Sequence, residues 1–128
     1  METAVTNNIR VSVIGRYQAE YSKPTQNQYV FSYHIIIENV GQETVQLLRR
    51  HWIITNSMGA VEEVEGEGVI GQQPILEAGE IHRYDSWCPL TSPFGFMEGS
   101  YLFLNHDTGE HFEAVVPRFR LESDVVLN

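Results

Sequence analysis

Apolar and polar residues alternate along much of this chain with a period of two. Between Tyr29 and Ile37 every second residue is apolar, and Ser32 and His34 stand between them. The segment from Ile9 to Val13 alternates in the same way. Successive side chains of a β-strand point to opposite faces, so this pattern predicts strands with one buried face. Further strands are predicted in Val45–Thr55, from Val61 through Val64, and in Ile81–Trp87, Tyr101–Leu104 and Phe112–Val116.

Turn residues separate these runs, and no segment of ten or more residues has the spacing of an amphipathic helix. The segment Asp107–Glu110 carries Gly109 between two β-rich runs, which predicts a hairpin. About seven short strands with turns roughly every 8–12 residues predict an antiparallel β-sandwich of the immunoglobulin or fibronectin III type.

The length of 128 residues suits one domain, which we expect to span residues 1–128. We expect the first seven and the last five or so residues to fray, leaving an ordered part of approximately 8–123. The single cysteine, Cys88, excludes an internal disulfide. No apolar run reaches the roughly 20 residues of a membrane helix, and the first ten residues lack the charged and apolar regions that are typical of a signal peptide. These features predict a cytoplasmic protein.

The charge is strongly negative, with 17 Asp and Glu against 8 Lys and Arg and a formal net charge of −9. Binding a polyanion needs clustered cations, so nucleic acid and anionic membranes are poor candidate partners. The densest acidic segment lies at 62–67. Such a run fits either a solvated strand edge that resists aggregation or a surface that attracts cations or a basic protein.

A glycine motif overlaps the end of the acidic run: Gly66, Gly68 and Gly71 match the pattern G-x-G-x-x-G. In a dinucleotide site these glycines join a strand to a helix whose N-terminus receives phosphate. Pro74 would interrupt that helix. The motif is therefore a candidate anion loop, with a plain or bulged loop between two strands as the favoured alternative.

The charges near the motif distinguish an anion-binding loop from a plain loop. Glu65 and Glu67 would repel a phosphate group. An anion site at the loop requires Arg49, Arg50 or Arg83 to lie beside it.

Two histidines bracket the predicted hairpin loop. His106 and His111, with Asp107 or Glu110, would supply ligands suited to zinc, nickel or cobalt. These residues are a candidate site for a weakly bound divalent cation. Solvated turn residues are the alternative interpretation, since no neighbouring groups are evident that would orient the imidazole rings.

No set of residues typical of catalysis is present, so we expect a protein that is not an enzyme. Cys88 stands between Trp87 and Pro89, an apolar setting that raises a thiol pKa and favours an inert, packed cysteine. The aromatic residues are numerous for one small core, and Trp87, Phe94 and Phe96 are candidate partner-binding residues. Aromatic rings that only cap the ends of the sandwich are the alternative.

Three segments resemble the ApaG family: GEGVIGQQP at 66–74, YDSWCPLTSPFGFMEGSYLF at 84–103 and FEAVVPRFRLE at 112–122. The second is the most specific, and its matching residues are Cys88, Pro89, Leu90, Ser92, Pro93, Gly95, Met97, Gly99 and Tyr101. The similarity extends to the strand from Ile9 to Tyr17 and to 35–40, which is nearly the whole chain.

The resemblance implies a fibronectin III-like sandwich and a bacterial, stand-alone ApaG domain. Similar domains are appended to eukaryotic F-box proteins and to a protein that interacts with DNA polymerase delta, which implies protein recognition. The family is also associated, under the name CorD, with cobalt resistance and magnesium/cobalt efflux. We therefore expect an interaction module, a monomer or homodimer, whose link to Co²⁺ or Mg²⁺ is indirect. Weak cation binding and phosphate or nucleotide binding at 66–71 remain the alternatives.

Overall fold

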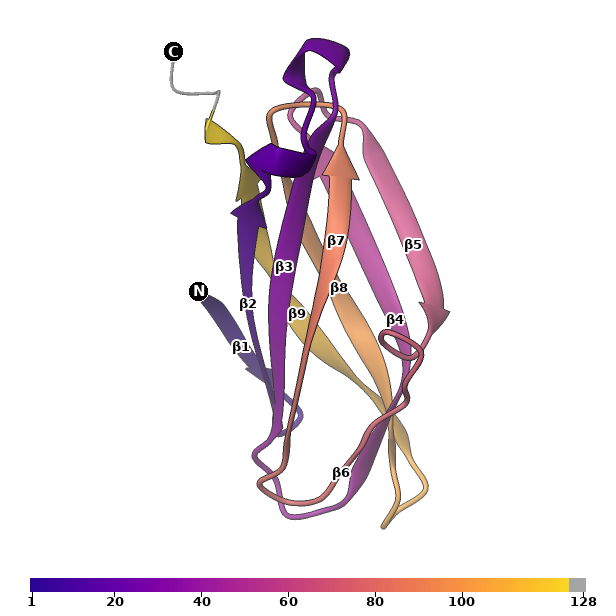
Figure 1. The fold of residues 1–128 in the computed structure, drawn as a ribbon. Coiled ribbons are helices and arrows are strands. Elements are labelled where there is room, and N and C mark those ends of the chain that lie inside the picture. The colour runs from indigo at the N-terminus through magenta and orange to yellow at the C-terminus, as the bar shows by residue number, and fades with distance from the viewer. Residues whose placement is uncertain (125–128) are drawn as a thin grey trace.

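The alternating segments form two antiparallel sheets in a computed structural model that describes residues 1–124 (Figure 1). One sheet has the strand order β1 (Glu2–Thr6), β2 (Ile9–Tyr17), β3 (Tyr29–Asn39) and β7 (Ile81–Leu90). The other has the order β5 (Val61–Glu67), β4 (Val45–Asn56), β8 (Phe94–Asn105) and β9 (His111–Glu122), and β6 (Ile75–Leu76) also pairs with β4. The predicted antiparallel β-sandwich is confirmed.

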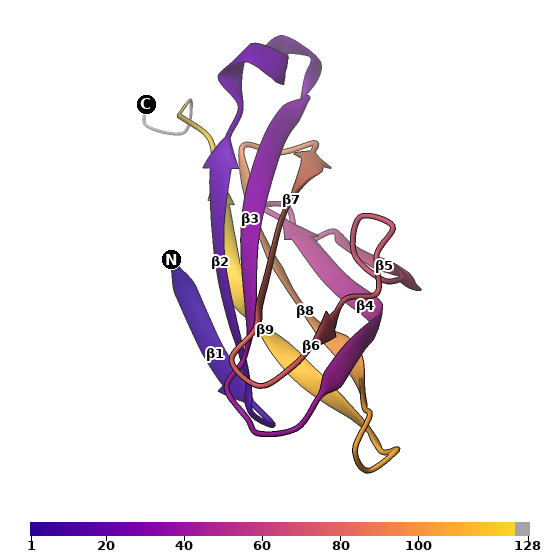
Figure 2. The ribbon, with the colours of Figure 1, turned by 60° about the horizontal axis from the view of Figure 1, so that its bottom comes forward.

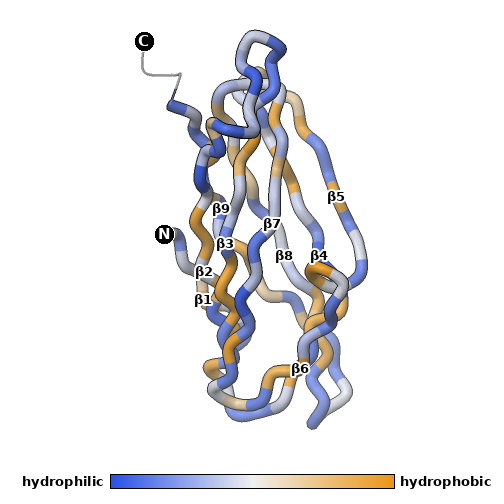
Figure 3. The backbone as a smooth tube through the Cα atoms, viewed as in Figure 1, coloured by the Kyte–Doolittle hydropathy of each residue, from blue (hydrophilic) through white to orange (hydrophobic). Residues whose placement is uncertain are grey.

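The core lies between the sheets and is built mainly from alternate residues of the longer strands. Along β3, for example, Phe31, Ile35 and Ile37 are fully buried, whereas His34 lies on the outer face and pairs with Asp85 of β7. Hydropathy accordingly changes from residue to residue along the strands in Figure 3. Burial of one face against the opposite sheet is the main stabilising contribution in such a fold.

Aromatic rings join the two sheets at the centre of the core. Trp52 of β4 meets Tyr33 of β3 edge to face, with ring centroids 5.4 Å apart, and meets Phe119 of β9 at 6.1 Å. Tyr84 of β7 and Tyr101 of β8 are hydrogen-bonded through their hydroxyl groups. A buried phenol needs such a partner, so this pair ties β7 to the second sheet.

The two sides of the sandwich differ. On one side β1 and β2 both contact β9, and the Asn7 side chain donates a hydrogen bond to the carbonyl of Glu113. On the other side β5 and β7 are the edge strands, each paired along only one of its edges within the described residues. Figures 1 and 2 show β1 and β5 at opposite sides of the molecule. One side is therefore closed by strand contacts, and the other presents two strand edges.

Several boundaries differ from the sequence expectation. The expected fraying of the first seven residues is wrong for Glu2–Thr6, because this segment pairs with β2 from Glu2↔Val13 to Thr6↔Ile9. The expected fraying of the last five residues falls mainly on 125–128, which lie outside the described residues. The described chain contains nine strands rather than about seven, and β1 and β6 are the two that the pattern missed.

Two short 3-10 helices, η1 (Ala19–Tyr21) and η2 (Pro24–Gln26), occupy the connection between β2 and β3. Among residues 1–124, no helix has the length and apolar character needed to cross a bilayer.

Candidate functional site

A β-bulge in β4 determines which way its two consecutive arginines point. Leu47 pairs with Phe103 of β8, but the next pair is Arg49 with Leu102, so the register shifts between Leu47 and Arg49. After this shift Arg50 pairs with Tyr101, whose side chain is fully buried. Opposed residues of neighbouring strands share a face, so Arg50 lies on the inner face and Arg49 on the outer.

The guanidinium of Arg50 is held by the backbone of the glycine motif. Its Nη1 donates to the carbonyl oxygen of Glu67 at 2.9 Å and to that of Gly68 at 3.1 Å. A Cβ on Gly66 would lie 2.8–2.9 Å from the guanidinium atoms, closer than van der Waals contact allows. Gly66, the cross-strand partner of Arg50, is therefore the residue that lets the arginine side chain cross the face of β5.

The rest of the glycine motif forms a tight two-residue hairpin turn. Val69 and Gln72 exchange backbone hydrogen bonds of 2.8 and 3.0 Å, and the residues between them, Ile70 and Gly71, have φ of 47° and 73°. Positive φ at both central positions is typical of a type I′ turn. Gly68 also has positive φ, and a Cβ there would lie 2.2 Å from the carbonyl oxygen of Gln72. The motif is a loop between strands, as the favoured interpretation expected, and no helix follows it.

Ile70 is the unusual residue of this turn. A β-branched side chain at φ of 47° is sterically strained, and asparagine or glycine is the usual choice. The Ile70 side chain is also 61% exposed. The turn thus holds an apolar side chain outward at a conformational cost.

Two adjoining cavities run along the open side of the sandwich and share four residues, Tyr33, Arg50, Trp52 and Ser86. One, of about 170 Å³, is completed by Tyr84 and by the turn residues Val69, Ile70 and Gly71. The other, of about 250 Å³, is completed by Ile54, Glu62, Val64, Trp87, Cys88, Pro89 and Met97. We call the two cavities together the edge groove.

Burial sets the acid–base state of the groove walls. It raises the pKa of Tyr33 and of Tyr84, and it raises the pKa of the Cys88 thiol to about 12. It also raises the pKa of Tyr101, the hydrogen-bond partner of Tyr84 in the core. These groups are therefore neutral at physiological pH. The charged groups along the groove are Arg50 near its middle and Glu62 on the side of Trp87.

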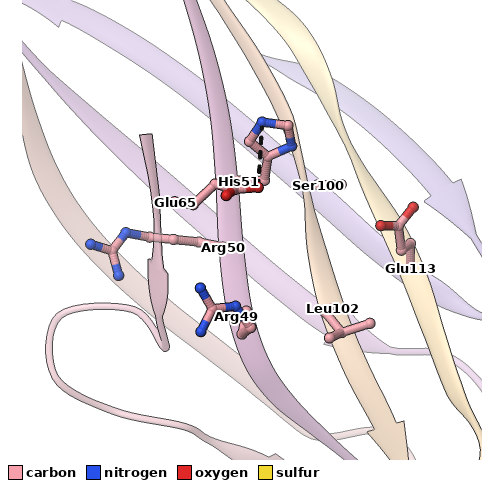
Figure 4. Close-up of a pocket in the computed structure, with 7 residues that line it drawn as sticks. All are labelled: Arg49, Arg50, His51, Glu65, Ser100, Leu102 and Glu113. Carbon is pink, nitrogen blue, oxygen red and sulfur yellow. Dashed lines mark ion pairs between the residues drawn. The ribbon is translucent and has the colours of Figure 1, made fainter. Parts of the chain in front are cut away.

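The outer face of the same sheet carries a smaller hollow of about 150 Å³ (Figure 4). His51 and Glu65 face each other there, with His51 Nε2 3.9 Å from Glu65 Oε1 and also 3.9 Å from Glu63 Oε2. Arg49 and Arg50 leave the strand in different directions in this view. In residues 1–124 no group of three or more His, Cys, Asp or Glu side chains has an arrangement that would hold a metal ion.

The four residues of the predicted cation site lie at the predicted hairpin loop and are all exposed. The structure does not gather them into a cluster. His106 Nε2 lies 2.9 Å from Gln46 Oε1 on β4, and the backbone N–H of Asp107 donates to the side chain of Asn105. These contacts account for His106 and Asp107 as turn residues.

The three predicted partner-binding aromatics are dispersed. Trp87 is 53% exposed on β7, lines the edge groove and meets Tyr21 of η1 edge to face at 5.3 Å. Phe94 is half-buried near the start of β8. Phe96 lies under the guanidinium of Arg118, 3.9 Å from the ring centroid. Only Trp87 of the three lines the groove.

The tyrosines of the groove were not among the predicted site residues, and Arg50 was predicted only as one of three arginines that an anion site would require. One signal was available, because Arg50 and Trp52 are two positions apart and share a strand face. Arg50 is the arginine that lies beside the glycine motif.

Known proteins resemble this chain over nearly its whole length. Protein ApaG of Rhodospirillum centenum is 48% identical over 123 residues, which cover 96% of this chain and 94% of the relative. Protein ApaG of Acidithiobacillus ferrooxidans is 44% identical over 128 residues and covers all of both chains. A crystal structure of an ApaA protein from Bordetella pertussis superimposes with a TM-score of 0.87 at 45% identity, covering 91% of this chain and 94% of that one. The family model of the ApaG domain matches residues 19–105, and together these similarities show that the chain belongs to the ApaG family.

Proposed function

We propose that this protein is a non-enzymatic recognition module that binds a segment of a partner protein along the edge groove. The observation that carries the proposal is the asymmetry of the sandwich. Contacts of β1 and β2 with β9 close one side, whereas a groove lies along the other side between the edge strands β5 and β7.

The residues of the groove are of the kinds that dominate protein recognition. Trp87 exposes more than half of its surface beside the groove, and Trp52, Tyr33 and Arg50 form its walls. Trp, Tyr and Arg are enriched at the energetic centres of interfaces, because they combine a large apolar surface with a polar tip. The neutral phenols and the high pKa of Cys88 favour binding over nucleophilic chemistry at this site.

Site-specific photo-crosslinking tests this proposal. A photoreactive phenylalanine analogue replaces Trp87 in one variant and Val115 in another, and each is irradiated in cells of the native host. Val115 is a matched control, since it is 45% exposed but lies on β9. We expect a discrete adduct with a partner protein from position 87 and none from position 115.

A second variant checks that the adduct depends on the groove. Gly66→Ala drives the Arg50 side chain out of its place, so the adduct from position 87 should weaken while the far-ultraviolet circular dichroism stays that of a β-sandwich. Adducts of equal yield from positions 87 and 115, or none from either, would contradict the proposal.

The bound partner protein would link this chain to the family association with cobalt resistance. We propose that a contribution of this chain to cobalt or magnesium handling is indirect and requires the protein bound in the edge groove. The predicted cation site at the β8–β9 hairpin and nucleotide binding at 66–71 gain no comparable support. The hairpin residues are bonded as turn residues, and the glycine motif is a hairpin turn.

A further inference from the structure

We propose that the edge groove takes an extended protein segment that carries an aspartate or glutamate, and that Arg50 binds its carboxylate. This inference rests on the proposed function and adds the chemistry of the segment that is recognised. Four observations support it: the unpaired charge of Arg50, the way its side chain is fixed, the neutral walls around it and the shape of the groove.

Arg50 differs from the arginines of the described chain that form ion pairs. Arg10 pairs with Glu38 at 2.9 Å, Arg118 with Glu98 at 3.9 Å and Arg120 with Glu122 at 3.5 Å. No carboxylate oxygen of residues 1–124 lies within 4.0 Å of the Arg50 guanidinium, although this side chain is half-buried. Withdrawing a cation from water without an anion costs free energy, so the site is suited to an anion from outside.

Backbone carbonyls fix the guanidinium while leaving donors free. Both hydrogen bonds of Arg50 come from Nη1, to the carbonyls of Glu67 and Gly68. Within the described residues, Nε and Nη2 have no hydrogen-bond partner. Two N–H groups in a planar fork match the two oxygens of a carboxylate. Since the side chain is already held in place, little conformational entropy is lost when the carboxylate binds.

Inside the edge groove the residues around Arg50 are neutral donors and apolar rings, with Glu62 as the one carboxylate among the described lining residues. On the outer side Arg50 also borders the hollow that Glu65 and Glu113 line. Tyr33 and Ser86 line both cavities together with Arg50, and Tyr33 stays protonated because burial raises its pKa. Hydroxyl groups can donate to a carboxylate, and the adjacent Trp52 lowers the local polarity. A carboxylate–guanidinium bond is stronger in such surroundings than in water.

The shape of the groove favours a protein segment over a small anion. The two cavities adjoin and extend from Gly71 to Pro89, with the exposed side chains of Ile70 and Trp87 near the two ends. An extended segment would place apolar side chains against both. The strain at Ile70 is consistent with a role in binding, because strained residues persist where function requires them.

Glu62 makes the site directional. The pairs Arg50↔Gly66 and Ile54↔Glu62 are four positions apart along β4 and β5, which is roughly 13 Å of strand. An acidic residue of the segment therefore fits at Arg50, near the glycine turn, and is repelled at the end near Trp87.

Titrations followed by nuclear magnetic resonance test the inference on the whole protein. The probes are the capped pentapeptide Thr-Val-Glu-Val-Thr, its Thr-Val-Gln-Val-Thr analogue and sodium acetate. The Nε–Hε resonance of Arg50 reports on the guanidinium, and the β5 and β7 amides report on the groove. We expect the Glu peptide to shift the Arg50 Nε–Hε resonance and the amide resonances of β5 and β7. We also expect it to bind about tenfold more tightly than the Gln peptide.

Matched variants distinguish the contribution of Arg50 to peptide binding from that of Arg49. Arg50→Gln should abolish the preference for the Glu peptide, whereas Arg49→Gln on the outer face should leave it unchanged. Arg50→Lys keeps the charge but loses the planar fork, so it should keep part of the preference. The amide spectrum of each variant shows whether the sandwich is folded, and Arg50→Lys serves as the test if Arg50→Gln does not fold.

Each outcome decides the proposal. Equal binding of the Glu and Gln peptides would overturn carboxylate recognition, while the proposed function would stand if position 87 still gives its adduct. A shift of Arg50 with acetate but with neither peptide would show a small-anion site and would overturn the protein segment. Binding of no probe would overturn the inference, and if position 87 also gives no adduct, the proposed function fails with it.

Discussion

At the scale of single residues, the glycine motif is explained by three different steric demands. Gly66 leaves room for the Arg50 guanidinium, Gly68 avoids the carbonyl of Gln72, and Gly71 supplies a positive φ in open space. None of these demands involves a phosphate. The motif resembles a nucleotide fingerprint because tight turns and close backbone approach need glycine in both settings.

These steric demands predict different losses of unfolding free energy for Gly68→Ala and Gly71→Ala. In Gly68→Ala the new Cβ meets a backbone oxygen at 2.2 Å and φ is +63°, so we expect a loss of more than about 2 kcal/mol of unfolding free energy. In Gly71→Ala φ is +73° but no atom lies within 4 Å, so only the left-handed strain of about 1–2 kcal/mol remains. Urea unfolding of both variants measures the difference. Equal losses would show that the contact with Gln72 is relieved by movement of the turn.

At the scale of elements, the N-terminal strand β1 gives one side of the sandwich its closure. It pairs with β2 along its whole length and contacts β9, where the backbone N–H of Val115 donates to the Thr6 hydroxyl at 3.4 Å. Most residues of β1 are exposed, so its sequence shows little hydrophobic alternation. Pairing with β2 and contacts with β9, rather than burial of its own side chains, hold β1 in place.

Removal of residues 2–6 should therefore destabilise the sandwich without abolishing the fold. We expect a loss of roughly 1–3 kcal/mol of unfolding free energy, since the edges of β2 and β9 become exposed to water. Val5→Ala serves as control and should cost well under 1 kcal/mol, because Val5 is exposed. Urea unfolding gives both values. Unchanged stability in the truncated protein would restore the view that this segment frays.

At the scale of the whole molecule, buried tyrosine and cysteine side chains make the free energy of unfolding fall at alkaline pH. Burial raises the pKa of Tyr33, Tyr84 and Tyr101 above the ordinary value of 10.0 and that of Cys88 from 9.0 to about 12. When the chain unfolds, these groups regain their ordinary pKa values. Above about pH 9 the folded state therefore binds more protons than the unfolded state, and the free energy of unfolding falls as pH rises.

Urea midpoints at pH 7, 9, 10 and 11 check this dependence. We expect little change up to about pH 8 and a progressive fall above pH 9. Cys88→Ala removes the thiol, so the urea midpoint of this variant should begin to fall only near pH 10, where tyrosines of the unfolded chain lose their protons. A midpoint that stays level from pH 8 to 11 in the unmodified protein would show that these groups are solvated in the folded state.

The pattern of residues alone was enough to predict the β-sandwich, because the period of two is a local property that most of the strands display independently of their partners. It also determined the β8–β9 hairpin and the packed cysteine, since their signals lie within a few residues of chain. The strand β1 was missed because an exposed strand leaves no alternation to detect.

The position of the candidate site depends on contacts between strands that no local pattern of residues reveals. The bulge between Leu47 and Arg49 fixes which of two consecutive arginines faces inward, and a shift of one residue moves a side chain to the other face of a sheet. Tyr33 and Ser86 are paired on neighbouring strands of one sheet, and Arg50 of the other sheet meets them only when the sandwich closes. Which side of the sandwich stays open likewise follows from contacts between β1, β2 and β9, which are far apart in the chain and leave no local pattern.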